Sequence, residues 1–268
     1  MRNIVTTLLT TLLMSLYPNR RNNRKNNLLK KMRIKYLFVA ILVSTGLITA
    51  QNTNKNFSIN GSLEFNTRYI WRGIHFSNSP VLFPSLGLEY NGLALSSTAG
   101  YALDGKHTEI DFSLSYSNRG FTIGINDYFM PSSLSSDNYF DFDTKSTYHS
   151  VETYLTYSLA KIPLWFTASC FVYGNDRDTN LDNFYSTYIE TGYVFNFKKK
   201  GDISLILGVT PFKGTYAESF NVVNITAKYD YNLHLSNLKV PLSASLIANP
   251  SANKVYLTFS FFITTNQK

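Results

Sequence analysis

The 268-residue sequence has one cysteine, few charged residues and, after residue 50, no apolar run long enough to cross a membrane as a helix. One cysteine excludes a disulfide scaffold. Charged residues make up only 16% of the chain, whereas 44% of the residues are hydrophobic, which excludes general disorder. A membrane-spanning helix needs about 18 consecutive apolar residues. Disulfide-rich, disordered and helical membrane proteins are therefore all disfavoured.

The net charge of +8 comes from the N-terminal region alone. The first 50 residues contain nine of the 25 Lys and Arg residues and no Asp or Glu. The rest of the chain has sixteen bases against 17 acids, and its formal charge is −1. The folded part therefore has no general attraction for nucleic acid.

Residues 32–50 have the three regions of a secretory signal peptide. Arg33 and Lys35 precede an apolar run over residues 36–48, and Ala50 is a small residue at the expected cleavage position. We expect the mature chain to begin at Gln51. Residues 1–31 are interpreted as a spurious or unstructured extension, with translation beginning at Met32. The alternative is a genuine anchor with a basic arm for anionic lipid.

Alternation of apolar and polar residues with a period of two dominates residues 51–268. Between Glu109 and Ser117, every even position is apolar or aromatic and every odd position is polar. A strand places two such sets on opposite faces. Similar runs predict twelve strands, approximately at residues 57–70, 81–90, 93–103, 107–117, 120–130, 147–160, 162–173, 184–197, 201–210, 219–234, 238–249 and 253–264.

The predicted connections tend to alternate between short and long. Asn91-Gly92 is typical of a tight hairpin turn. The longer connections are polar and comprise residues 71–80, 131–146, 174–183 and 211–218. An even number of strands of about ten residues, joined in this way, predicts an all-β fold: a transmembrane antiparallel up-and-down β-barrel that forms residues 51–268 and closes through its last strand. The alternative is a soluble sandwich or lipocalin-like barrel, whose outer face would need more charge.

Strand parity places ten charged residues on the face that would line the lumen. They are Glu64, Arg68, Arg72, Glu89, Glu109, Asp111, Glu152, Glu190, Lys228 and Asp230. They predict either a polar pore that acts on solutes by charge or a network of ion pairs that fills the barrel. Arg68 and Arg72 share one predicted strand face, about 13 Å apart. They are candidates to bind an anionic solute at the outer mouth, or to pair with Glu64 and Glu89.

The spacing of the histidines indicates no catalytic set. His75, His107 and His149 lie on the predicted long-loop side, where a lipid hydrolase would place a Ser/His/Asn set, but serine is abundant throughout the chain. His107, Glu109 and Asp111 share a strand face at a spacing that suits a divalent cation, although a solvated rim cluster is the preferred interpretation. We predict no catalytic residue, metal site or cofactor.

Two consecutive segments resemble a known family. RYIWRGIHFS over residues 68–77 and PVLFPSLGLEY over residues 80–90 are similar to the opening hairpin of the TorF-like porin family. Other short segments between residues 57 and 264 resemble outer-membrane barrels of Bacteroides-type bacteria. The resemblance implies a Gram-negative outer membrane, contact with its lipids and its barrel-assembly machinery, and passive diffusion of small hydrophilic solutes. A non-conducting barrel for structure or adhesion and a rim lipid hydrolase are the alternatives.

Overall fold

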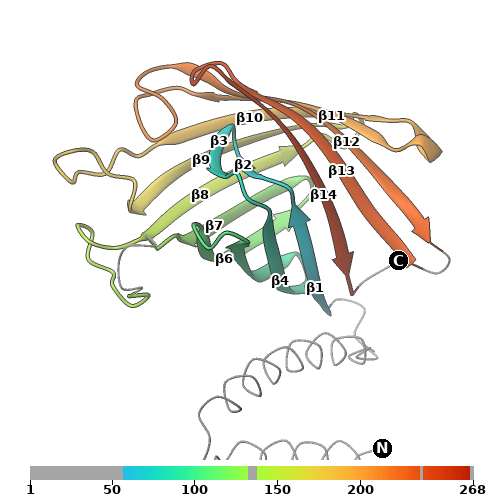
Figure 1. The fold of residues 1–268 in the computed structure, drawn as a ribbon, viewed down its shortest axis with the longest axis horizontal. Coiled ribbons are helices and arrows are strands. Elements are labelled where there is room, and N and C mark those ends of the chain that lie inside the picture. The colour runs from blue at the N-terminus through green and yellow to red at the C-terminus, as the bar shows by residue number, and fades with distance from the viewer. Residues whose placement is uncertain (1–56, 132–137, 236–237, 266–268) are drawn as a thin grey trace, which may run out of the picture. The chain divides into compact units, whose positions relative to one another are not determined.

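The computed structural model describes residues 57–131, 138–235 and 238–265. Within these residues, no helix is long and apolar enough to cross a membrane. Twelve strands form one closed antiparallel barrel, in which strands that are neighbours in sequence pair side by side (Figure 1). The predicted all-β up-and-down barrel is therefore confirmed. The predicted extension and signal peptide lie outside the described residues.

The barrel strands are β1 (Phe57–Asn66), β4 (Val81–Tyr90), β5 (Leu93–Ala102), β6 (Thr108–Asn118), β7 (Phe121–Phe129), β8 (His149–Ser158), β9 (Leu164–Gly174), β10 (Thr187–Asn196), β11 (Asp202–Thr210), β12 (Asn221–Leu235), β13 (Leu238–Asn249) and β14 (Lys254–Thr264). A short 3-10 helix, Lys198–Lys200, precedes β11. The remaining strands, β2 (Tyr69–Trp71) and β3 (Ile74–Ser77), pair with each other in a separate two-stranded sheet. The barrel closes between β1 and β14, where Ser62 to Asn66 pair with Thr264 to Ser260.

The outer face of the barrel is apolar. Along β6, the outward side chains of Ile110, Phe112, Leu114 and Tyr116 are 36–46% exposed, whereas the inward Glu109 is 2% exposed. The outward residues of β4, β7, β11 and β14 are exposed in the same way. A large apolar surface of this kind is removed from water by lipid. The distribution excludes the soluble alternative, in which the apolar face points inward, and defines a transmembrane β-barrel.

The tight turn predicted between β4 and β5 has the expected geometry. Asn91 and Gly92 have φ values of 50° and 86°. Positive φ at both central residues characterises the type I′ turn, whose twist matches that of two paired strands. Arg119 and Gly120 repeat this geometry between β6 and β7, with φ values of 49° and 85°.

The first predicted strand, residues 57–70, was too long. Barrel pairing of β1 ends at Asn66, and Tyr69–Trp71 instead pairs with Ile74–Ser77. This hairpin, residues 69–77, lies inside the barrel wall rather than forming a long outer loop (Figure 1). We name it the lumen hairpin. Tyr69 and Trp71 stand near the end of the first predicted strand, where aromatic residues commonly mark a membrane interface. They do not do so here, because both rings pack against other rings inside the barrel.

Val223 departs from the alternation of β12. A regular strand would place it on the same outward face as Ile225, but Val223 has no exposed surface and packs in a cluster inside the barrel. The register between β11 and β12 shifts at Gly208 and Val209. A bulge of this kind inserts one residue and exchanges the two faces beyond it.

Candidate functional site: the lumen hairpin and its cavity

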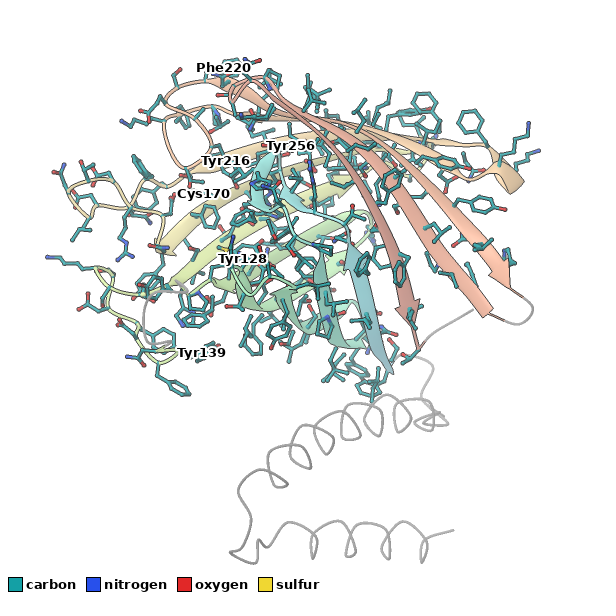
Figure 2. All side chains as sticks on the ribbon, in the orientation of Figure 1. Tyr128, Tyr139, Cys170, Tyr216, Phe220 and Tyr256 are labelled. Carbon is teal, nitrogen blue, oxygen red and sulfur yellow. The ribbon has the colours of Figure 1, made fainter. Side chains whose placement is uncertain are left out.

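Trp71 anchors the lumen hairpin by packing against rings from three parts of the barrel. Its ring centroid lies 5.7 Å from that of Tyr128 on β7, 6.4 Å from Phe171 on β9 and 6.1 Å from Tyr216 in the connection between β11 and β12. Phe171, Tyr216 and Tyr188 are each less than 7% exposed. Figure 2 shows Tyr128 and Tyr216 within the barrel outline. A hydrophobic core therefore fills part of the lumen, on the side of the long connections.

Arg72 lies at the turn of the hairpin, and its guanidinium group both donates hydrogen bonds and packs against aromatic rings. Its guanidinium forms an ion pair with Glu152 on β8, donates a second hydrogen bond to Glu152 at 3.1 Å and donates to the Tyr216 hydroxyl at 2.7 Å. The guanidinium carbon also lies 4.3 Å from the ring centroid of Trp71 and 4.6 Å from that of Tyr188. The arginine therefore combines a bidentate pair with stacking between two aromatic rings.

The buried carboxylate of Glu152 is satisfied by neighbouring donors. Its side chain has no exposed surface, and Tyr128 donates a hydrogen bond to it at 3.1 Å in addition to those from Arg72. Burial raises the pKa of the Tyr216 phenol, so that this group stays protonated beside Arg72. Charged groups can be buried in this way when they are paired and hydrogen-bonded.

The other side of the hairpin turn presses on β12 and β13. Asn249 donates a hydrogen bond from its side-chain amide to the Gly73 carbonyl at 3.1 Å. Gly73 has a φ of 79°, and a Cβ atom there would overlap the carbonyl oxygen of Val223. Only glycine combines this backbone conformation with so close an approach. The turn is thus held between β8 and the β12–β13 pair.

The base of the hairpin contacts the remaining part of the wall. The ring centroid of Tyr69 lies 4.9 Å from that of Phe83 on β4 and 5.3 Å from that of His107, just before β6. His75 stacks on Tyr256 of β14 at 5.7 Å. Together with the contacts of the turn, these interactions place the hairpin across the lumen.

The lumen beside the hairpin contains a polar cavity of about 380 Å³. Its charged lining residues are Glu64, Arg68, Glu109, Asp111 and Lys228, and its neutral polar lining residues include Asn66, Thr98, Ser245, Thr258 and Ser260. One carboxylate oxygen of Asp111 is buried and has no hydrogen-bond partner among the described residues. The cavity is therefore a hydrophilic space enclosed by a membrane barrel, bounded on one side by Tyr69 and Trp71.

The other five residues predicted to line the lumen do not line this cavity. The prediction that Arg68 and Arg72 share one strand face was wrong, because the chain leaves β1 after Asn66. Of the two alternatives for Arg72, pairing with Glu64 and Glu89 is not observed, because Arg72 pairs with Glu152. Glu190 accepts hydrogen bonds from Tyr188 and Asn224, Asp230 pairs with Lys228 at 2.9 Å, and Glu89 accepts a hydrogen bond from Ser58 at 3.3 Å.

The sequence analysis did not identify the barrel residues that contact the hairpin. Tyr188 interrupts the polar face of β10 as an inward aromatic residue, and this signal was available in the alternation. Tyr216 and Asn249 gave no such signal, since Tyr216 lies in a connection and Asn249 at a strand end.

The three histidines on the long-connection side do not form a hydrolase set. The His107 Nε2 atom lies 3.0 Å from Glu109, and the His149 Nδ1 atom lies 2.9 Å from Asp127. In the described part of the chain, no hydrogen bond joins a histidine to a serine hydroxyl, and no group of three potential metal ligands comes together.

These features define a class: a twelve-stranded transmembrane barrel with a hairpin folded across a charged lumen. No protein-family model and no curated protein sequence matches the chain. Among solved structures, the KdgM porin is similar at 13% identity, covering 78% of this chain and 99% of that chain with a TM-score of 0.46. The KdgM porin in complex with disordered oligogalacturonate gives the same identity and coverage, with a TM-score of 0.44.

The translocator domain of the autotransporter NalP from Neisseria meningitidis is 10% identical, over 90% of this chain and 96% of that chain, with a TM-score of 0.28. Identities of this size carry neither a substrate nor a mechanism from one protein to another.

Proposed function

We propose that the chain is a porin-like channel of a Gram-negative outer membrane, through which small hydrophilic solutes diffuse passively and in which the lumen hairpin sets the width of the passage. The observation that carries the proposal is the charged, polar cavity of about 380 Å³ inside a closed barrel. A polar space inside the barrel is what the passage of a hydrophilic solute requires. The resemblance of residues 68–90 to the TorF-like porins is consistent with this proposal, as is insertion by the barrel-assembly machinery among outer-membrane lipids.

The charge of the lumen favours cations. The ten charged residues considered above comprise seven acids and three bases. One of the three bases, Arg72, is paired with buried Glu152, and a second, Lys228, pairs with Asp230. A passage lined by an excess of one charge, with walls of low dielectric constant, concentrates ions of the opposite sign. We therefore expect a preference for K⁺ over Cl⁻.

Single-channel recording tests this proposal. The refolded chain in planar bilayers should give discrete conductance steps, and its reversal potential in a KCl gradient should indicate cation preference. A variant in which residues 69–77 are replaced by a Gly/Ser linker of equal length should conduct more per step, because the hairpin no longer occupies the lumen. Equal conductance in both proteins would show that the hairpin does not limit the passage.

A non-conducting barrel is the second candidate. The observation that favours it is that the lumen hairpin contacts the wall at β4, β7, β8, β13 and β14. In this case the native chain is silent in planar bilayers and only the linker variant conducts. We propose no enzymatic activity for the chain.

A further inference from the structure

A histidine–carboxylate pair on the outer face of the barrel is covered by the connection between β7 and β8. Asp127 and His149 have outward parity, because Asp127 pairs with Val151 and His149 pairs with Phe129 in the β7–β8 ladder. Nevertheless, His149 is only 1% exposed. Residues 138–147, which we name the outer flap, cover it, and Figure 2 shows Tyr139 of this flap at the periphery, away from Tyr128 and Tyr216. The flap thus lies on the side of the barrel that faces lipid.

Both ring nitrogens of His149 face hydrogen-bond acceptors. The Nδ1 atom lies 2.9 Å from each carboxylate oxygen of Asp127, and the Nε2 atom lies 2.7 Å from the carbonyl oxygen of Tyr139. A neutral imidazole has one N–H group, whereas an imidazolium has two. With an ionised Asp127, both contacts are made only when His149 carries the second proton. If Asp127 carries this proton instead, its hydroxyl donates to Nδ1 and the Nε2–H group donates to Tyr139, so the number of hydrogen bonds is the same. In either form, the Asp127–His149 pair must hold one extra proton for both contacts to be made.

Three aromatic rings surround the imidazole. The ring centroids of Phe129, Tyr139 and Phe142 lie 4.8, 4.9 and 4.7 Å from that of His149, and the Phe142 ring is stacked on it. Aromatic faces attract a cation. Two of these rings belong to the flap, and the charge therefore also favours the closed position of the flap.

Other charged and titratable groups face this site. Asp141 of the flap accepts a hydrogen bond from Ser146, which lowers its pKa, and the charges of Arg177 and His149 act in the same direction. Arg177, between β9 and β10, donates to the carbonyl oxygens of Thr144 at 2.8 Å and Thr147 at 2.9 Å. Burial and the charge of Asp127 raise the pKa of the Tyr139 phenol, which stays neutral.

The flap carries two exposed apolar side chains beside the lipid-facing surface. Phe140 is 82% exposed and Phe142 is 54% exposed. The outward residues of the two adjoining strands, including Ile125 and Leu155, form the apolar face that meets lipid. Aromatic side chains at the end of such a face are typical of the polar boundary of a bilayer. The partner that fits this surface is thus the membrane itself.

We propose that residues 138–147 form a proton-dependent membrane flap, which His149 fastens to the outer face of the barrel with Phe140 and Phe142 at the lipid boundary. The direction of the pH dependence follows from these contacts. At low pH the pair holds the fastening proton and both contacts are made. As the pH rises this proton is lost, the remaining imidazole N–H stays on Nδ1 facing the ionised Asp127, and the unprotonated Nε2 atom no longer donates to Tyr139. The flap is therefore fastened at Tyr139 in mildly acidic medium and released there in alkaline medium, whereas the bonds from Arg177 to Thr144 and Thr147 and from Tyr173 to Phe142 do not depend on this proton. This inference does not depend on whether the barrel conducts.

Spin labelling of the full chain in vesicles of phosphatidylcholine and phosphatidylglycerol tests the proposal. A nitroxide, itself apolar, is attached at position 140 by Phe140→Cys in a Cys170→Ala background. At about pH 5.5 the label should be immobilised and more accessible to dissolved oxygen than to a water-soluble nickel chelate. At about pH 9 the mobile fraction should increase several-fold and the order of accessibility should reverse, since these values bracket the range in which histidine changes charge.

Two histidine variants separate the proposed cause from other effects of pH. His149→Gln cannot carry the second proton, so the label should be mobile at both pH values. His234→Gln, which changes a histidine near the end of β12, should leave the transition intact. Retained resistance to SDS at room temperature shows that each barrel is folded. A label that stays immobile at both pH values in His149→Gln would overturn the fastening role, and a label that prefers the nickel chelate at pH 5.5 would overturn the lipid contact.

Discussion

The attachment of the lumen hairpin depends on a carboxylate with no exposed surface. Burying Glu152 and Arg72 costs desolvation free energy, which the bidentate contact, the Tyr128 hydroxyl and the two stacked rings offset. Such a pair adds little to stability compared with apolar groups of the same shape. Removing one partner is different, because the other charge then remains buried without compensation.

This asymmetry gives a prediction for variants of the pair. Glu152→Gln and Arg72→Met should each lower the free energy of unfolding by about 3–5 kcal/mol. The double variant should lower it by less than the sum, since neither charge is then left alone. Urea titration in lipid vesicles measures the three values. The exposed pair Lys213–Glu218 is the control, and Glu218→Gln should change little. Additive losses would mean that the two side chains act independently.

Gly73 offers a second test at the level of one residue. Gly73→Ala places a side chain at positive φ, which costs about 1–2 kcal/mol, and also forces the new Cβ against the Val223 carbonyl. Gly105 has a similar φ of 73°, but a Cβ atom there would meet no other atom within 4 Å. We therefore expect Gly73→Ala to lower the melting temperature further than Gly105→Ala, and to raise channel conductance by displacing the hairpin. Equal effects of the two substitutions would contradict the close contact with β12.

The lumen hairpin shows where alternation ceases to determine structure. Strand parity correctly described residues such as Ile110 and Phe112, because each lies in a regular ladder. The same alternation runs on past Asn66, and an aromatic residue near a strand end suits a membrane interface as well as a lumen. The partner of Arg72 lies 80 residues away on β8. Only the closed barrel brings these two residues together, and no local pattern in the sequence records the contact.

The closing strand leads to a prediction for one element. Deleting residues 255–268 removes most of β14 and leaves unpaired edges on β1 and β13. Unpaired backbone groups are costly in hydrocarbon, so the truncated chain should fail to insert. The measurement is heat-modifiable mobility of protein extracted from outer membranes. Removing only residues 266–268 is the control, since the β14 strand ends at Thr264. Normal mobility of the longer truncation would refute the closure through β14.

The distribution of charge along the whole chain predicts how it is processed. All nine bases of residues 1–50 lie in a region without acids, and an apolar run ends just before Ala50. We expect the mature protein to begin at Gln51 and to carry a formal charge near −1. N-terminal sequencing of protein isolated from outer membranes measures this directly. The presence of residues 1–31 in the isolated protein would contradict the prediction.

Two adjacent positions test which face of the barrel meets lipid and which lines the lumen. Leu155 points outward and is 49% exposed, whereas the next residue, Thr156, points inward and forms a hydrogen bond of 2.7 Å with Thr167. Leu155→Arg places a charge in hydrocarbon and should cost about 2–4 kcal/mol at the bilayer midplane.

Thr156→Arg places the same charge in the lumen, where water and acids can solvate it, and should cost less. In a conducting barrel it should also shift the reversal potential toward anions, because it adds a positive charge to an acidic passage. Urea titration in vesicles gives the two stabilities. Equal losses at both positions would mean that the lumen around Thr156 is too tightly packed to accept a charge, and that the polar cavity beside the hairpin does not extend along the barrel as a passage.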